Sequence, residues 1–439
     1  MLGMKKCELM VLLSLQLSSL QSCGIPSNNM AVTERIYQGE ISLDTLAEIV
    51  EKNIIIKKDV DLRGTVCKIP VGMTLRFKGG KIKNGQLVGS GTKIKYHGTV
   101  FENVGIAGTW YVPEIKTSMF ADINYPNALK NVMALANPFC RNKIVIEPGN
   151  YTLVAGKNGD VCLRTCSNTE LVINGTIQLA PNDYSNYYIL QVEGNNVVIR
   201  GKGAIVGDKH SHTGEKGEWG MGINIGRAHH VTISGINVKD CWGDCIYIGA
   251  RSSEVDISKC VLDHGRRQGI SATSGRNIHI YNCMIINVGG TPPGYAIDIE
   301  PNEADTVTNV LIERVKMENC IGGVMTTIFG RDARSKVGNI EIKHCQISTN
   351  GDEPLRITRC DTANVSCCKI YASNKTAMIN LFKVGHAIME NNKLTIHNEL
   401  LSSIRNSVRW VTGRDGGYIA IKKTQCGAIE DYGNHIVFK

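Results

Sequence analysis

Large aromatic residues are scarce in this chain, and long apolar runs are nearly absent. Only seven Phe and four Trp occur among 439 residues, whereas Gly occurs 46 times. This composition favours many short turns over a few long helices. After the first 22 residues no apolar run is long enough to span a bilayer. The bulk of the chain is therefore not predicted to cross a membrane as helices.

Signals for nucleic acid and for zinc are also missing. The net charge is +9 at pH 7, spread along the chain rather than gathered in one run. It permits an acidic partner, but no basic helix and no mixing of aromatic and basic residues points to nucleic acid. His210 and His212 lie close together without a second pair, and no Cys/His spacing matches a zinc site.

The first 22 residues predict a signal peptide of the lipoprotein type. Lys5 and Lys6 form a basic start, and the short apolar stretch that follows is too short for a membrane helix. The sequence "LQSC" resembles a bacterial lipobox, with lipid added to the thiol of Cys23; a plain secretory signal is the alternative. We expect export and anchoring in a bacterial envelope, in the periplasm or at the outer-membrane surface. Residues 23–54 would then be a tether and lead-in.

Sixteen cysteines would suggest disulfides in an exported protein. Cys260, Cys283 and Cys345, however, occupy the same place in successive similar phrases. Free Cys behaves as a small hydrophobic residue. The spacing therefore predicts a buried ladder of free thiols.

A phrase of alternating apolar residues recurs through the second half of the chain. Its first apolar residue recurs at steps of 24, 23, 32, 30 and 25 residues and has a later match at Ile388: Val231, Val255, Ile278, Val310, Ile340 and Val365. Each unit reads as short strands separated by Gly, Asn and Asp turns. One unit cannot bury its own apolar face, but stacked units can, with strands about 4.8 Å apart. The repeat predicts an all-β fold, a right-handed parallel β-helix.

Three stretches of sequence resemble known β-helix proteins. "GRRQGIS" and "GYAIDIEPN" are similar to bacterial and phage members of the pectate lyase-like superfamily, and residues 60–110 resemble the N-terminal opening of Bacteroidetes-type members. "NALKNVMALANPFC" resembles the entry of tailspike-type domains, in which a short helix, here about Asn127 to Leu135, caps the apolar end of the coil stack. The resemblance implies a β-rich entry segment at 55–125 and the parallel β-helix at 126–400. Residues 401–439 are predicted from their own sequence to form a β-rich cap.

Aligning one strand across the coils places polar and charged residues on one outer face. Two columns point inward by alternation and are apolar. The column between them reads Asn224, Tyr247, Ser271, Asp298, Met325 and Arg356. Glu300 shares the face of Asp298, two residues further on. At the entrance of the strands lie Asp244, Arg266, Arg267 and Gln268, so we expect a compact polar patch.

This patch could serve three chemistries. As the resemblance implies, Asp244, Asp298 and Glu300 could bind a Ca²⁺ ion that bridges to a uronate, while Arg266 or Arg267 takes a proton in a β-elimination. A carboxylate pair could instead hydrolyse a glycosidic bond. Alternatively the patch only binds sugar. Candidate substrate contacts are Asn224, Tyr247, Trp219, Trp242, Gln268, Ser271 and Arg356.

The hydrolase motifs of polygalacturonase-type proteins are mostly absent. "WGDCIYIG" resembles their D-D phrase, but Gly243 replaces its first Asp, Gln268 replaces a His, and Met221 stands where a further Asp would be. His264, in "DHGRR", is a candidate general acid or base, or a turn residue bonded to backbone. We therefore predict an enzyme that degrades an acidic polysaccharide, with β-elimination narrowly favoured. Hydrolysis, C5 epimerisation and non-catalytic carbohydrate binding at the cell surface are the alternatives.

Overall fold

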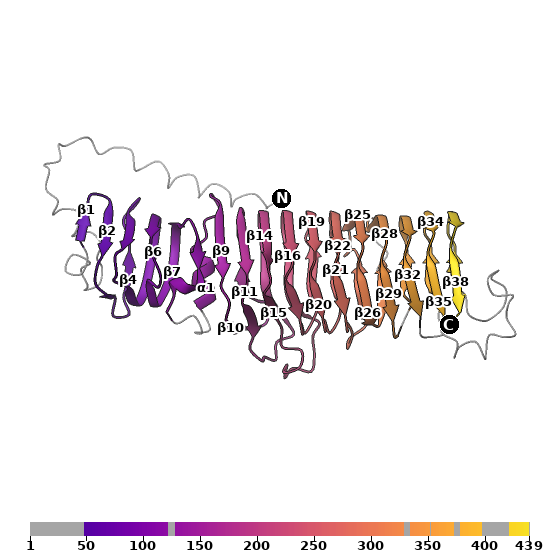
Figure 1. The fold of residues 1–439 in the computed structure, drawn as a ribbon, viewed down its shortest axis with the longest axis horizontal. Coiled ribbons are helices and arrows are strands. Elements are labelled where there is room, and N and C mark those ends of the chain that lie inside the picture. Colours follow the sequence, from indigo (N-terminus) through magenta and orange to yellow (C-terminus); the bar gives the residue numbers. More distant parts are fainter. Residues whose placement is uncertain are drawn as a thin grey trace, which may run out of the picture.

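In the computed structural model the coils stack into one long rod, from β1 at one end to β38 at the other (Figure 1). The structure describes residues 48–121, 128–328, 334–351, 353–372, 378–396 and 421–438. The predicted signal peptide, Cys23 and residues 401–420 of the predicted cap lie outside these ranges. Within them no helix has the length and apolarity needed to cross a membrane.

The described strands form three sheets. A seven-stranded sheet builds the N-terminal coils: β1 Glu48–Val50, β2 Asn53–Ile56, β3 Val60–Asp61, β4 Val66–Lys68, β5 Thr74–Phe77, β6 Ile82–Lys95 and β7 Phe101–Tyr111. An eleven-stranded sheet runs along the main stack: β10 Asn150–Leu153, β13 Thr176–Leu179, β15 Ala204–Val206, β17 Asn237–Lys239, β20 Val261–Asp263, β23 Met284–Ile286, β26 Lys316–Cys320, β29 Gln346–Thr349, β32 Lys369–Ala372, β35 Lys393–Ile396 and β38 His435–Phe438.

The third sheet has 20 strands and carries the face on which the site was predicted. Its strands are β8 Ile115–Lys116, β9 Asn142–Ile146, β11 Asp160–Arg164, β12 Thr169–Ile173, β14 Asn186–Gly201, β16 Trp219–Ser234, β18 Ile246–Gly249, β19 Ser252–Ser258, β21 Ile270–Ala272, β22 Gly275–Tyr281, β24 Tyr295–Ile299, β25 Thr306–Glu313, β27 Gly322–Thr326, β28 Lys336–Lys343, β30 Leu355–Thr358, β31 Cys360–Ser366, β33 Ile379–Phe382, β34 His386–Glu390, β36 Ile421–Thr424 and β37 Ala428–Tyr432. Strands of successive coils pair in parallel, as the repeat predicted.

The predicted columns are confirmed residue by residue. Strands β16, β18, β21, β24, β27 and β30 place the expected outward residues in one register: Asn224, Tyr247, Ser271, Asp298, Met325 and Arg356. The flanking inward columns, which begin at Ile223 and Ile225, are buried. Phrase similarity was a reliable guide here because each coil repeats the same strand.

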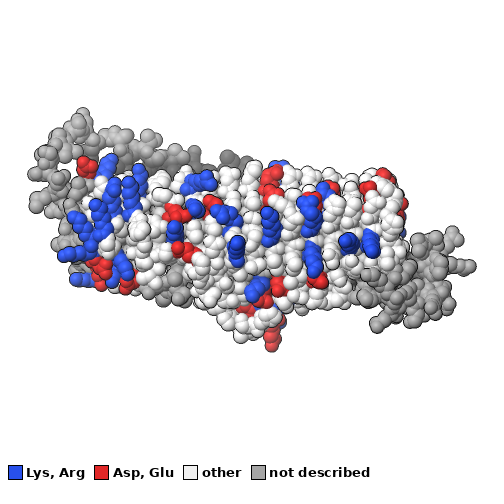
Figure 2. Space-filling view, in the orientation of Figure 1, with Lys and Arg blue, Asp and Glu red and all other residues white. Residues whose placement is uncertain are grey.

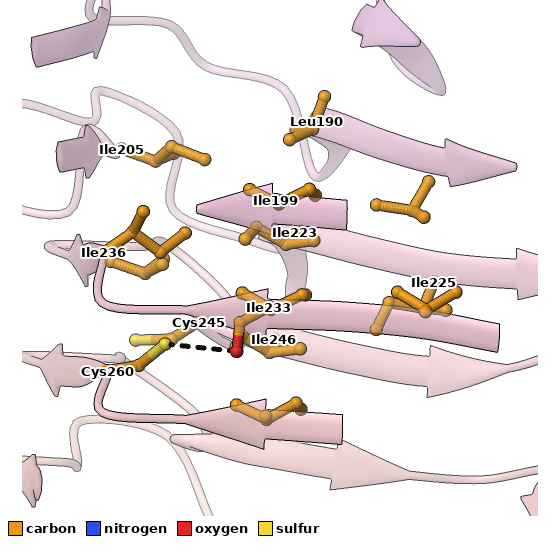
Figure 3. Close-up of a cluster of buried hydrophobic side chains, with 14 of the residues drawn as sticks. Leu190, Ile199, Ile205, Ile223, Ile225, Ile233, Ile236, Cys245, Ile246 and Cys260 are labelled. Atoms are coloured by element: carbon orange, nitrogen blue, oxygen red, sulfur yellow. Dashed lines mark hydrogen bonds between the residues drawn. The ribbon is translucent and has the colours of Figure 1, made fainter. Parts of the chain in front are cut away.

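The interior is filled by columns of stacked aliphatic side chains, of which Leu190, Ile223 and Ile246 form one (Figure 3). The predicted thiol ladder is confirmed: Cys260, Cys283 and Cys345 are free and almost fully buried. The Cys260 Sγ lies 3.8 Å from the carbonyl oxygen of Ile233 in the coil below. The thiols therefore act as small core residues with weak hydrogen bonds.

Two of the repeat positions were wrong. Ile340 pairs with Ala363 rather than Val365, which pairs with Ile342. Ile388 pairs with Asn364, on the outward side. A shift of two residues leaves the inward and outward pattern of a strand unchanged, so alternation alone could not detect the first error.

The ends of the coil stack extend beyond the predicted boundaries. Strand β2 begins at Asn53, within the predicted tether, and pairs with β5. Strands β36 to β38, inside the predicted cap, pair with β33 to β35 and continue the coils. The predicted helix is present as α1, Ala128–Ala134, beside the 3₁₀ turn Thr117–Met119. It packs against both β7 and β11, so it lies at the junction of two coil groups and does not close a free end.

Candidate functional site

The predicted patch is organised around one guanidinium group, that of Arg267. Its Nη1 lies 3.3 Å from the Oδ2 of Asp244, its Nη2 lies 3.8 Å from the Oε2 of Glu300, and its Nε lies 3.5 Å from the Oε2 of Glu218. These carboxylates come from three coils, which the parallel register stacks beside each other. The side chain of Arg267 is only 15% exposed. One buried cation therefore holds several acids together.

Two of the acids lie beneath the surface. Asp244 is fully buried, and its Oδ2 accepts a hydrogen bond of 2.7 Å from the hydroxyl of Ser271. Asp298 is 1% exposed, and its Oδ2 accepts a hydrogen bond of 2.9 Å from the amide of Gln268. The Oε1 of Gln268 in turn accepts from the backbone N–H of Tyr295 at 2.7 Å, which fixes the amide orientation.

The second oxygen of each buried acid, the Oδ1, has no hydrogen-bond partner among the described residues. A buried carboxylate oxygen without a partner is costly, because desolvation is not offset. Such groups are typical of functional sites.

Burial shifts the pKa values of all three acids upward. Desolvation raises the pKa of Asp244 to about 6, against the opposing effect of Arg267. Desolvation and the neighbouring Glu300 raise the pKa of Asp298 well above its ordinary value. Desolvation also raises the pKa of Glu300. For Arg267 burial opposes the charge, but Asp244, Asp298 and Glu300 more than offset it, and the net pKa is raised. The guanidinium thus stays charged among acids that protonate easily.

We predict a pH-dependent stability difference between the wild type and Asp244→Asn. The folded pKa of Asp244, about 6, lies above the ordinary value of 3.8, so folding retains a proton that the unfolded chain releases. The contribution of Asp244 to the free energy of unfolding is fully present below the unfolded-state pKa and is lost as the pH rises through 6. Relative to wild type, the variant should gain up to about 3 kcal/mol between pH 4 and pH 7. Urea unfolding across that range measures it. A difference that stays constant with pH would contradict the burial of this charge.

Beside the carboxylates lies a stack of rings and guanidinium around Trp242. The Arg266 Cζ lies 3.7 Å from the Trp242 ring centroid, and the His212 ring centroid lies 3.8 Å from it. The Arg266 guanidinium and the His212 ring cannot both lie on the same face of the Trp242 ring at these distances, so Trp242 is sandwiched between them. Arg266 also donates to the carbonyl oxygens of Gly217 and Trp242, at 2.8 and 3.3 Å. It makes no ion pair with an acid in the described structure, and burial lowers its pKa.

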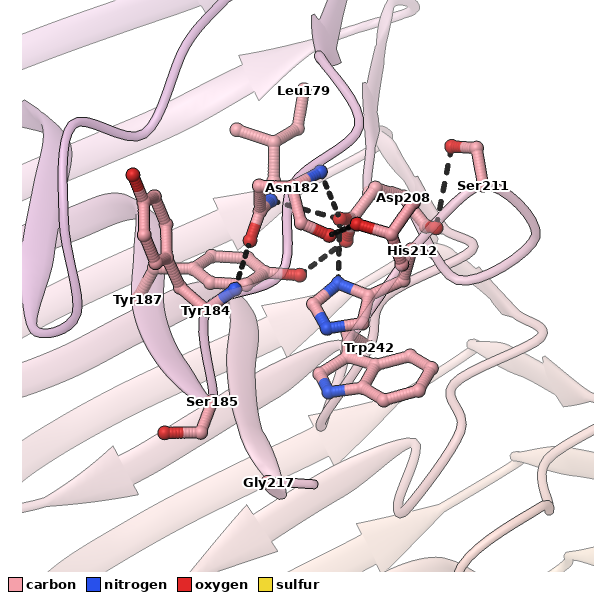
Figure 4. Close-up of polar contacts among 12 residues, drawn as sticks. Leu179, Asn182, Tyr184, Ser185, Tyr187, Asp208, Ser211, His212, Gly217 and Trp242 are labelled. Carbon is pink, nitrogen blue, oxygen red and sulfur yellow. Dashed lines mark hydrogen bonds and ion pairs between the residues drawn. The ribbon is translucent and has the colours of Figure 1, made fainter. Parts of the chain in front are cut away.

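The insertion that carries His212 lies beside the site, where His212 stacks on Trp242 (Figure 4). Its anchor is Asp208, which is 2% exposed. Asp208 accepts hydrogen bonds from the Tyr187 hydroxyl and from Asn182, and its Oδ2 lies 2.8 Å from the His212 Nδ1. This buried network fixes Trp242, and Trp242 positions Arg266.

Other predicted residues lie outside this cluster. Asn224 lies one coil below Tyr247, and its side-chain amide donates a hydrogen bond to Gln191. The Tyr247 hydroxyl oxygen lies 2.6 Å from the hydroxyl oxygen of Thr273. Arg356 pairs with Glu353 at 2.6 Å. In the outward column the buried Met325 lies between Arg356 and Asp298, so Arg356 is separated from the acid cluster.

His264 occupies a turn in the left-handed region, with φ 55°. Its Nδ1 lies 2.6 Å from the Asp263 Oδ1, and its ring lies edge-on to that of His210. No described contact joins it to Arg267 or to the three acids. We therefore interpret His264 as the turn residue that the sequence allowed, rather than the acid or base.

Glu218 is the site residue that the sequence interpretation missed. It lies in an insertion, where alternation gives no direction. The match of "EWGMGINI" with "CWGDCIYI" aligns Glu218 with Cys241, which is fully buried, so it gave no sign that Glu218 reaches Arg267. The two loops approach so closely that a Cβ on Gly243 would lie 2.4 Å from the Glu218 carbonyl oxygen. That contact also explains why Gly243 replaces the first Asp of the hydrolase motif.

The predicted calcium site is not supported by the arrangement of the three acids. Within the described residues no group of three or more His, Cys, Asp or Glu is placed to hold a metal ion. The guanidinium of Arg267 occupies the position between Asp244 and Glu300 where a cation would lie. The chemistry proposed for this site therefore uses no calcium ion.

Residues 149–324 match the model of the family described as "Right handed beta helix region". The chain is a right-handed parallel β-helix protein. The match and the parallel pairing of strands from coil to coil agree with the fold that the repeat predicted.

Two curated relatives come from Bacillus subtilis (strain 168). SPbeta prophage-derived uncharacterized protein YorA is 32% identical over 158 residues, 30% of this chain and 27% of the relative. Uncharacterized protein YclG is 29% identical over 184 residues, 35% of this chain and 31% of the relative. The chain thus spans less than a third of each relative.

Among solved structures, the mannuronan C-5 epimerase AlgE4 A-module of Azotobacter vinelandii aligns with a TM-score of 0.41 and 13% identity. The alignment covers 73% of this chain and 94% of that one. At this level of similarity nothing about activity follows.

Proposed function

We propose that the protein cleaves a uronate-containing polysaccharide by β-elimination at the face formed by Arg267 and Glu300. One observation carries the proposal: a charged guanidinium, held by buried acids, lies beside a partly exposed carboxylate whose pKa is raised. The side chains of Arg267 and Glu300 are 15% and 21% exposed. These two can touch a bound chain, whereas Asp244 and Asp298 cannot without movement.

Arg267 would bind the uronate carboxylate and stabilise the negative charge that develops on it. Its raised pKa keeps it protonated, so we assign it this electrostatic role rather than that of the base. The neighbouring acids hold the guanidinium in place before substrate arrives, which is the arrangement that favours transition-state stabilisation. Trp219 would offer an apolar face on which a sugar ring stacks.

Glu300 would act as the base and then as the acid. Its carboxylate takes the proton from C5 of the uronate, the C4–O bond to the leaving sugar breaks, and a C4–C5 double bond forms. The proton then passes from Glu300 to the leaving oxygen, so atoms and charges balance. The raised pKa of Glu300 suits both steps, because a base works best when its pKa lies near the working pH. Asp298 lowers the pKa of Glu300 and so offsets part of the rise that desolvation causes.

Hydrolysis is the second candidate, and a specific observation favours it. Asp244 and Asp298 are two neighbouring carboxyl groups, and burial raises the pKa values of both. Glycoside hydrolases use a pair of carboxyl groups as acid and base or nucleophile. Their complete burial argues against direct contact with a glycosidic bond. C5 epimerisation shares the proton abstraction, and simple carbohydrate binding needs only the face itself. Export and lipid attachment at Cys23 belong to the same proposal.

Protein that begins after Cys23 should release unsaturated products from a polyuronate. Polygalacturonate and alginate would be incubated with it, with dextran as the neutral control. Ultraviolet absorbance and reducing ends would be followed together. Both signals rising in parallel is the expected result. Reducing ends without absorbance would establish hydrolysis instead. No change in either signal, with polymer retained on the protein, would replace the enzyme by a binding protein.

A further inference from the structure

The basic charge of the chain is concentrated at its N-terminal end. Residues 51–112 hold eleven Lys and Arg against four Asp and Glu, a net +7 of the +9 for the whole chain. The expectation of an even spread was therefore wrong. Figure 2 shows Lys and Arg gathered over the N-terminal coils, while the rest of that face is mixed in charge.

On these coils an outer face carries cations in a regular array. Buried Ile54, Leu75 and Ile94 alternate with outward neighbours. Register places Arg76 beside Lys95 on the next coil, and Lys93 beside Tyr111 on the coil after that. Lys78 continues the outward side of β5. We call Arg76, Lys78, Lys93, Lys95 and Tyr111 the basic grid.

The grid lacks acids, although a neighbouring face of the same coils has them. There, Asp61, Lys83 and Glu102 alternate in sign in one register, and the Lys83 Nζ lies 2.8 Å from Asp59. None of the four grid cations forms an ion pair with an acid in the described part of the chain. The contrast shows that the fold can pair its lysines and does not do so on the grid.

Stacked strands lie about 4.8 Å apart, so adjacent like charges of the grid repel. An anionic chain that lies along the rod would remove this repulsion at each coil. Tyr111, which is 40% exposed, adds a flat apolar surface next to Lys93. Cations repeated at a fixed spacing beside an exposed aromatic ring fit a polymer of negatively charged sugars better than a lipid surface, which needs no ring.

We propose that the basic grid is a second binding site, for an anionic polysaccharide strand, separate from the Arg267 site. The class of glycan rests on the proposed function, but binding at the grid does not require that the protein be an enzyme. The grid would hold the polymer while the Arg267 site acts on another part of it. Long chains would then bind more tightly than short oligosaccharides.

The test compares two triple variants that lose the same charge. The grid variant is Lys78→Ser, Lys93→Ser and Lys95→Ser. The control is Lys68→Ser, Lys202→Ser and Lys259→Ser, which are exposed lysines outside the grid. Affinity for long polygalacturonate, measured at low salt, should fall about tenfold in the grid variant and little in the control. Turnover of short oligogalacturonates, if present, should stay unchanged in both.

Three results would overturn the proposal. The grid variant could bind the polymer as the wild type does, or both variants could lose affinity equally, which would indicate net charge alone. The wild type could also bind phosphatidylglycerol vesicles and no polyuronate, which would assign the grid to a membrane surface. Failure of the Arg267 site is distinguishable, because it removes turnover while polymer binding at the grid persists.

Discussion

Glu300→Gln is expected to lower turnover of a polyuronate about a thousandfold, because a positioned general acid–base group contributes a factor of this order. The amide keeps the shape of the side chain but can neither take the C5 proton nor return it. The side chain is 21% exposed and its closest described ion pair, to Arg267, is 3.8 Å long. The melting temperature should therefore change little. Initial rates of absorbance increase measure the effect.

Glu303→Gln is the matched control for this substitution. Glu303 is exposed on the loop after β24, three residues from Glu300, and its substitution removes the same charge. Its turnover should equal that of the wild type. If both variants retain activity, Glu300 is not the base; if both lose it, the effect is one of net charge. Polymer binding by Glu300→Gln should persist, which separates a chemical defect from a binding defect.

The sequence predicted the columns of the coil face correctly because two independent patterns agree there. Alternation assigns inward and outward residues, and the similar phrases around Ile246, Ile270 and Ile297 set the register. Where the phrase weakens, as at Val365, alternation alone permits a shift of two residues. The coil register was thus predictable wherever the repeated strand was well preserved.

Depth within the site could not be predicted from alternation. Asp298 points away from the core of its coil, as expected, and yet it is almost fully buried. Gln268 from the coil below covers it, and the insertion that carries Glu218 brings a further acid to Arg267. Insertions have no repeat to align them, so the repeat pattern could not predict which of their residues contribute to the site. The arginine base was implied by the family resemblance, whereas the surrounding acids raise the pKa of Arg267.

Arg267→Met is expected to lower the free energy of unfolding by about 3 kcal/mol near pH 8, because removing one partner leaves buried charges uncompensated. Asp244 would lose its only described ion-pair partner, and the acids beside it would repel one another. Near pH 5 the loss should be smaller, since Asp244, with a pKa of about 6, is then mostly protonated. Urea unfolding at both pH values measures the difference.

The pH dependence separates charge from packing, because Met replaces most of the apolar contact of Arg but none of its charge. Arg276→Met on β22 is the control: that side chain is 63% exposed and pairs with Glu254 only at 3.8 Å, so its loss should be small at either pH. Adding Asp244→Asn to Arg267→Met should restore part of the stability at pH 8. A loss that is equal at both pH values, and that the second substitution does not relieve, would mean that Arg267 serves mainly as packing. The acids would then have no cation to organise them, and the assignment of this face as the active site would fail with it.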